Sequence, residues 1–79
     1  MIVNITKKHI KNGHRNSIYE CPLALAIKCE LGKGGLDVSV GYQTVEIDNK
    51  LFVLSKPAAK FVEDFDAGKE VRPQKLKAY

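Results

Sequence analysis

The sequence predicts an α+β domain in which a small, mainly antiparallel sheet of four or five strands packs with a buried helix and a second, amphipathic helix. Three observations favour this class. Residues 22–31 are almost wholly apolar over a helical length, residues 36–54 contain three strand-like stretches, and residues 56–66 carry an apolar stripe at helical spacing. A chain of 79 residues has room for one small core. We therefore expect a single domain, residues 1–79.

The buried helix is expected from about Pro22 to Leu31, and the sequence marks both of its ends. Pro22 suits the first helical position, where its missing N–H costs nothing, and Gly32 suits the left-handed residue just past a helix end. Only Lys28 and Glu30 on this helix require water. A helix so apolar must be covered on more than one side, so it is expected to form the centre of the fold.

The segment before this helix predicts one strand and one short helix. Residues 2–5 are a short strand. Thr6 is a plausible N-cap for a helix over residues 7–12, and Gly13 is a natural stop for it. The polar residues that follow, up to about Ser17, predict a loop.

Three strands are expected after the glycine-rich connection that follows the buried helix. Residues 36–40 and 44–47 alternate between apolar and polar side chains. Asp48 and Asn49 then predict a tight hairpin turn into a strand over residues 50–54. Because the last four residues of that strand are all apolar, it is expected to lie in the middle of the sheet.

The second helix is expected to open at residues 55–57 and to end at Gly68. Its apolar stripe follows the spacing i, i+3, i+4, i+7 and consists of Ala58, Phe61, Val62 and Phe65. The acidic side chains of this helix are expected on its solvated face, with Asp66 hydrogen-bonded locally at the helix end.

Apolar runs and cysteine spacing indicate a protein of the cytoplasm. No run approaches the roughly 20 apolar residues that span a bilayer, and the start lacks a basic region followed by an apolar stretch, so no secretory signal is evident. On one helix Cys21 and Cys29 would lie roughly 12 Å apart, which is too far for a disulfide. We expect both to be reduced and largely buried thiols.

The residue pattern predicts no enzyme, no metal site and no cofactor. His9 and His14 are five residues apart and share no helical face, and no paired-cysteine knuckle accompanies them. Cys21 is the one candidate nucleophile, but Pro22 removes an N–H that would stabilise its thiolate, so a capping or buried role is expected. The glycine-rich segment 32–35 lacks the ending of a phosphate-binding loop.

Positive charge is concentrated at the two ends of the chain. Residues 1–19 hold four cations and no acid, residues 71–79 hold three cations and no acid, and the middle is acidic. Pro73 confines the tail to an edge strand or an extended arm. If that tail pairs beside the first strand, the cations form one face that favours a polyanion or an acidic protein surface. The candidate binding residues are Lys7, Lys8, Lys11, Arg15, Arg72, Lys75 and Lys77.

Two segments carry a resemblance that covers most of the chain. The first consists of His9-Ile10, Gly13 and the Cys-Pro-Leu-Ala-Leu-Ala run at residues 21–26. The second consists of Phe61, Phe65-Asp66, Gly68, Val71 and Pro73. Together they resemble a group of small uncharacterised bacteriophage and prophage proteins. These motifs are helix starts, helix stops and core faces, so the resemblance transfers no site. It implies a phage origin and residence in the cytoplasm of a bacterial host.

Two functions follow as expectations. The first is that of a phage accessory protein that binds a host or phage protein, through the basic residues or an exposed edge strand. The alternative is weak nucleic-acid binding without sequence specificity, through the basic termini. The aromatic residues are scattered, which argues against a platform on which bases stack.

Overall fold

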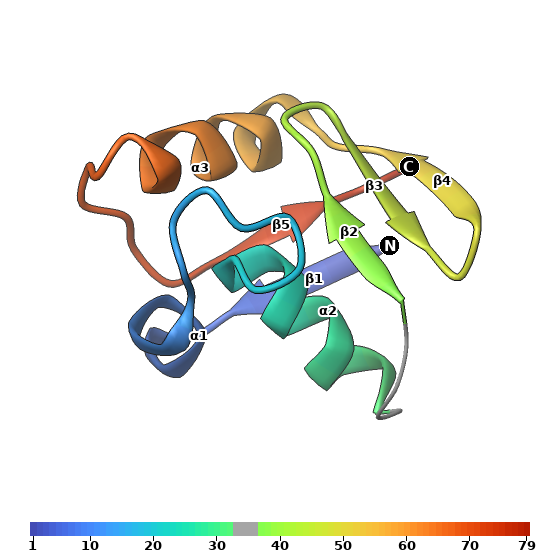
Figure 1. Cartoon of the computed structure of the whole chain (residues 1–79), viewed down its shortest axis with the longest axis horizontal. Coiled ribbons are helices and arrows are strands. Elements are labelled where there is room, and N and C mark those ends of the chain that lie inside the picture. Colours follow the sequence, from blue (N-terminus) through green and yellow to red (C-terminus); the bar gives the residue numbers. More distant parts are fainter. Residues whose placement is uncertain (33–36) are drawn as a thin grey trace.

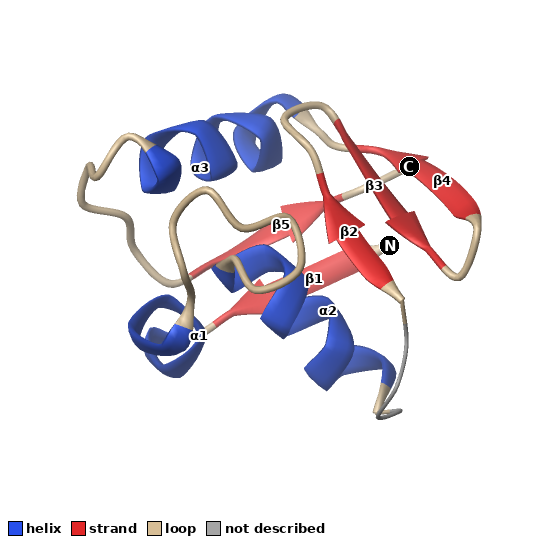
Figure 2. Ribbon diagram, viewed as in Figure 1, coloured by secondary structure: helices blue, strands red, loops and turns tan. Residues whose placement is uncertain are grey.

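The computed structural model describes residues 1–32 and 37–79 and confirms the α+β class (Figure 1). Figure 2 shows the helices and strands in separate colours. In chain order the elements are β1 (Ile2–Ile5), α1 (Lys7–Asn12), α2 (Pro22–Leu31), β2 (Val38–Val40), β3 (Thr44–Ile47), β4 (Lys50–Val53), α3 (Lys56–Asp66) and β5 (Gln74–Lys77). The predicted strand over residues 36–40 thus begins at Val38, and Leu36 lies outside the described residues.

The strands form two antiparallel sheets that meet near the chain end. β1 pairs with β5 over its whole length, and β2, β3 and β4 form a three-stranded sheet in that order. Val53 and Tyr79 exchange two backbone hydrogen bonds, and Leu54 forms an isolated bridge with Ala78. The last residues of the chain therefore connect β4 to β5.

The core lies where α2 and α3 pack on the inward faces of these strands. α2 is buried from Pro22 to Ile27 apart from the half-buried Leu25, whereas its last turn is exposed, and α3 buries its predicted stripe. In the view of Figure 1, α3 lies above the β1–β5 pair and α2 below it. The strands contribute alternate side chains to this core: Val3, Ile5, Val38, Val40, Val45, Ile47 and Leu76.

The local signals for helix ends and turns are confirmed. Pro22 occupies the first turn of α2, and Gly32 ends that helix in the left-handed conformation, with φ of 66°. Thr6 caps α1 by accepting the backbone N–H of residue 9. Asp48 and Asn49 both have positive φ, as a two-residue hairpin turn requires.

The prediction that the strand at residues 50–54 lies in the middle of a sheet is confirmed only at its end, where Val53 and Leu54 also pair with residues 78–79. β4 is the last strand of its three-stranded sheet. Phe52 faces the core, but Leu51 and Val53 point outward and expose 66% and 55% of their surface. Only one face of β4 is therefore buried, and the apolar residues on its other face are exposed to solvent.

Candidate interaction surfaces

Three of the predicted basic residues converge on one open hollow of about 630 Å³, because the pairing of β1 with β5 brings α1 beside the segment before β5. Lys7 and Lys11 reach it from α1, and Arg72 reaches it from that segment. Lys8 is exposed on α1 next to Lys7. We call this site the basic hollow, and it is lined by Lys7, Ile10, Lys11, Glu70, Val71, Arg72 and Pro73.

The other predicted basic residues lie elsewhere. Lys75 and Lys77 are exposed on β5, where they stand opposite Asn4 and Ile2 of β1. The guanidinium of Arg15 lies beside Gly68, just past the C-terminal end of α3, where a cation is favoured by the free carbonyls of a helix. The seven residues therefore do not line a single hollow.

A second surface was missed by sequence reasoning. In antiparallel strands, paired residues and residues two apart point to the same face. Leu51 and Val53 are two apart on β4, Val53 pairs with Tyr79, and Lys77 stands opposite Ile2. All of these side chains therefore point away from the core. We call this surface the outer sheet face, and it comprises Ile2, Asn4, Ser39, Thr44, Glu46, Leu51, Val53, Lys75, Lys77 and Tyr79.

The outer sheet face has an apolar centre with charges on both sides. Tyr79 exposes 71% of its surface and Ile2 exposes 57%, so they are as open as the two β4 residues. Glu46 stands opposite Leu51 on the β3 side, and Lys77 lies on the β5 side. A contiguous apolar patch on a protein surface is a candidate interaction site. The signal in the sequence was the run at residues 51–54, which sequence reasoning took for burial.

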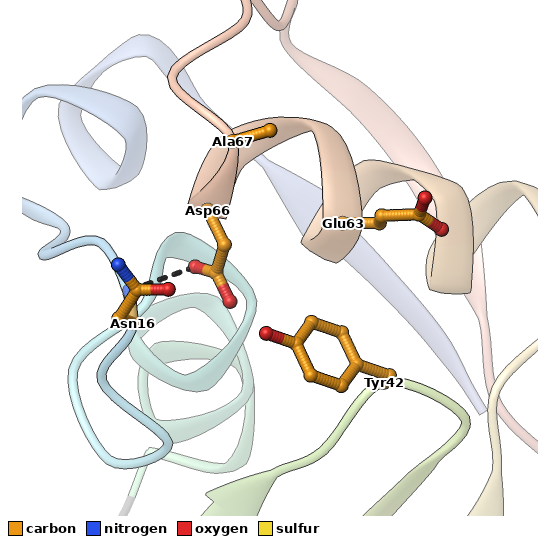
Figure 3. A pocket seen from close by; sticks show the side chains of 5 residues that line it. All are labelled: Asn16, Tyr42, Glu63, Asp66 and Ala67. Atoms are coloured by element: carbon orange, nitrogen blue, oxygen red, sulfur yellow. Dashed lines mark hydrogen bonds between the residues drawn. The ribbon is translucent and has the colours of Figure 1, made fainter.

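A second hollow, of about 390 Å³, lies between the loop after α1 and the end of α3 (Figure 3). The backbone N–H of Asn16 donates a hydrogen bond of 2.9 Å to Oδ1 of Asp66, and the hydroxyl of Tyr42 points toward the same carboxylate in Figure 3. The prediction that Asp66 bonds locally is therefore wrong. This carboxylate instead accepts a hydrogen bond from the loop at Asn16, which is 50 positions away in sequence.

The two cysteines differ in their surroundings. Cys21 is buried and caps α2, since its Sγ accepts the N–H of Ala24 at 3.4 Å, which agrees with the capping role predicted for it. Burial raises the pKa of the Cys21 thiol. Cys29 is exposed, so the prediction that it is buried is wrong, because it lies in the last turn of α2, where residues 29–31 are all exposed. Neither cysteine forms a disulfide.

The two histidines serve separate local contacts. Nδ1 of His9 accepts the backbone N–H of Thr6 at 3.1 Å, which completes the cap of α1. The ring of His14 is exposed and lies 3.8 Å from a carboxylate oxygen of Glu20. Across residues 1–32 and 37–79, no three metal-ligating side chains are grouped together.

No protein-family model, curated protein or solved structure matches the chain. Within the part of the chain that the structure describes, no helix combines the length and apolar character needed to cross a membrane.

Proposed function

We propose that this protein is a non-enzymatic accessory protein of phage type that binds a host or phage protein through its outer sheet face. The observation that carries the proposal is the exposure of Leu51, Val53 and Tyr79 on one side of the joined strands. Burying a leucine or valine side chain is worth about 1.5–3 kcal/mol. A partner that covers these residues would gain several times that amount before the costs of association.

The inward side chains of the same strands support this proposal. Val45 and Phe52 of β3 and β4 already contribute to the core, so the outward positions are not needed to bury the helices. Apolar residues on a solvent-facing side of a strand favour aggregation, and native proteins usually carry charges there. Their presence at Leu51 and Val53 is explained if another protein covers them. The resemblance to phage proteins supports the same class.

The experiment is an affinity capture from bacterial lysate, with and without nuclease, that compares the wild type with L51T/V53T. Threonine is β-branched, which strands favour, and both positions are exposed, so we expect the variant to retain its fold. The matched control is Y42T, which removes a side chain that is 59% exposed on the turn between β2 and β3. We expect the wild type to capture a partner protein both with and without nuclease. Capture of that partner should fall roughly tenfold or more in L51T/V53T but not in Y42T. Equal capture by all three proteins would overturn the proposal.

The basic hollow supports a second candidate function, nucleic-acid binding without sequence specificity. Lys7, Lys11 and Arg72 gather around one open surface, and only Glu70 among its lining residues carries a negative charge. Lysine and arginine side chains in such a group contact phosphates without reading bases. In the capture experiment, this function predicts that partners are no longer captured after nuclease treatment. It also predicts that the wild type and L51T/V53T capture the same amount of partner.

A further inference from the structure

The charges beside the outer sheet face indicate the chemistry of its partner. We propose that this face binds an acidic protein segment whose apolar side chains cover Leu51 and Val53 and whose carboxylates reach Lys75 and Lys77. The inference rests on the proposed function and names the class of partner for the same surface.

The geometry places the two lysines at one border of the apolar centre. Lys75 and Lys77 are successive outward positions on β5, and Tyr79, the next outward position beyond that strand, pairs with Val53 of β4. Among the described residues, neither Lys75 nor Lys77 forms an ion pair. Both ammonium groups are therefore available to a partner that lies over the centre of the face. Such border charges select the partner and speed its association.

The same arrangement disfavours a second copy of this chain as the occupant. Among the described residues, Glu46 is the one carboxylate side chain on this face that each copy would offer to the two lysines of the other copy. Each chain also carries a net charge of +4, so the approach of two copies is opposed by repulsion. An acidic segment supplies carboxylates for both lysines and meets no such repulsion.

The surface also differs from a typical nucleic-acid site. Leu51, Val53 and Ile2 offer apolar contacts that phosphates do not use, and within residues 1–32 and 37–79 Tyr79 is the one aromatic side chain on the face. A protein segment covers both the apolar centre and the lysine border. A nucleic acid would leave the apolar centre open to water.

The test is an NMR titration of the ¹⁵N-labelled chain with two synthetic amphipathic peptides that differ only in charge, one of Leu and Glu and one of Leu and Lys. We expect the acidic peptide to shift the amides of Leu51, Val53 and Lys77 and to bind on the order of tenfold more tightly at low salt. The variant K75E/K77E should reverse this preference. The control K7E/K11E changes the same number of charges on α1, and this variant should still prefer the acidic peptide.

Each other result overturns the inference, and the results separate it from the proposed function. Equal binding of the two peptides, or an unchanged preference in K75E/K77E, removes the role of the lysines. If neither peptide binds while the captured partner still depends on Leu51 and Val53, the proposed function stands and the acidic partner is wrong. A dimer in sedimentation that L51T/V53T abolishes would assign the face to a second copy. Shifts on this face from oligothymidylate in place of the peptide would assign it to nucleic acid.

Discussion

Val53 and Tyr79 each donate a backbone hydrogen bond to the other, and both bonds measure 2.7 Å. The pairing continues where the N–H of Ser55 donates to the carbonyl of Lys77 at 2.9 Å. A two-stranded sheet is marginal by itself, so this connection supports the β1–β5 pair from one side. It also sets the outer sheet face, because paired residues share a face and Tyr79 is thereby placed beside Val53.

The replacement Y79P tests the importance of this connection. Proline lacks the N–H that residue 79 donates to Val53, so we expect a loss of about 1 kcal/mol in the free energy of unfolding. The control Y79A keeps that N–H and removes only an exposed side chain, so it should stay within about 0.5 kcal/mol of the wild type. Urea unfolding measures both. Equal destabilisation by the two variants would show that the hydrogen bond adds nothing.

Gly13 tests a close approach between two segments. A Cβ atom at residue 13 would lie 2.6 Å from the ring carbons of Pro22, although its φ of −73° suits any residue. We therefore expect G13A to lower the free energy of unfolding by about 1–3 kcal/mol through overpacking. In the control G41A, the new Cβ would meet its nearest atom, the carbonyl oxygen of Thr44, at 3.5 Å. Thermal unfolding should therefore show little change for G41A, and a comparable loss in both variants would contradict this account.

The sequence predicted those features that depend on neighbouring residues. Thr6, Pro22 and Gly32 act within one helical turn of their own positions, so the helix ends follow from local chemistry. Gly13 does follow the last residue of α1, as predicted. Its contact with the Pro22 ring, however, depends on how the loop returns to α2. That path is a property of the whole fold.

The surfaces were harder to predict because they depend on distant pairings. The run at Leu51 to Leu54 indicates two apolar faces, but it does not say which face another element covers. That outcome depends on the chain end, which pairs with Val53 from 26 positions away. The basic residues at the two termini were identified from charge alone. Which of them share a hollow depends on the register of β1 with β5.

The two thiols should react with a soluble disulfide reagent at very different rates. Cys29 is exposed and should react rapidly in the folded protein, whereas Cys21 is buried and should react only on unfolding. The variant C29S isolates Cys21, and its labelling at neutral pH should match the rate of unfolding. Rapid labelling of folded C29S would contradict the capping role and show that Cys21 is a reactive thiol.

The buried thiol of Cys21 should also make the free energy of unfolding depend on pH in the alkaline range. Because burial raises the pKa of Cys21, the folded chain keeps this proton at a pH where the unfolded chain has lost it. The unfolded state then binds fewer protons, so the free energy of unfolding falls as pH rises above the thiol pKa of the unfolded chain. The difference in stability between the wild type and C21S should therefore vary with pH in the alkaline range and be constant near neutrality. A difference independent of pH would contradict the assignment.

The basic hollow is tested by the salt dependence of oligonucleotide binding in fluorescence anisotropy. If Lys7 and Lys11 contact phosphates, affinity should fall steeply with salt, and K7E/K11E should reduce the slope of log affinity against log salt by about 2. The control K50E/K56E removes two exposed lysines that do not line the hollow. It carries the same net charge, so a general effect of charge would weaken both variants equally. Selective loss in K7E/K11E would place phosphates in the hollow, and equal loss would show that binding follows net charge alone.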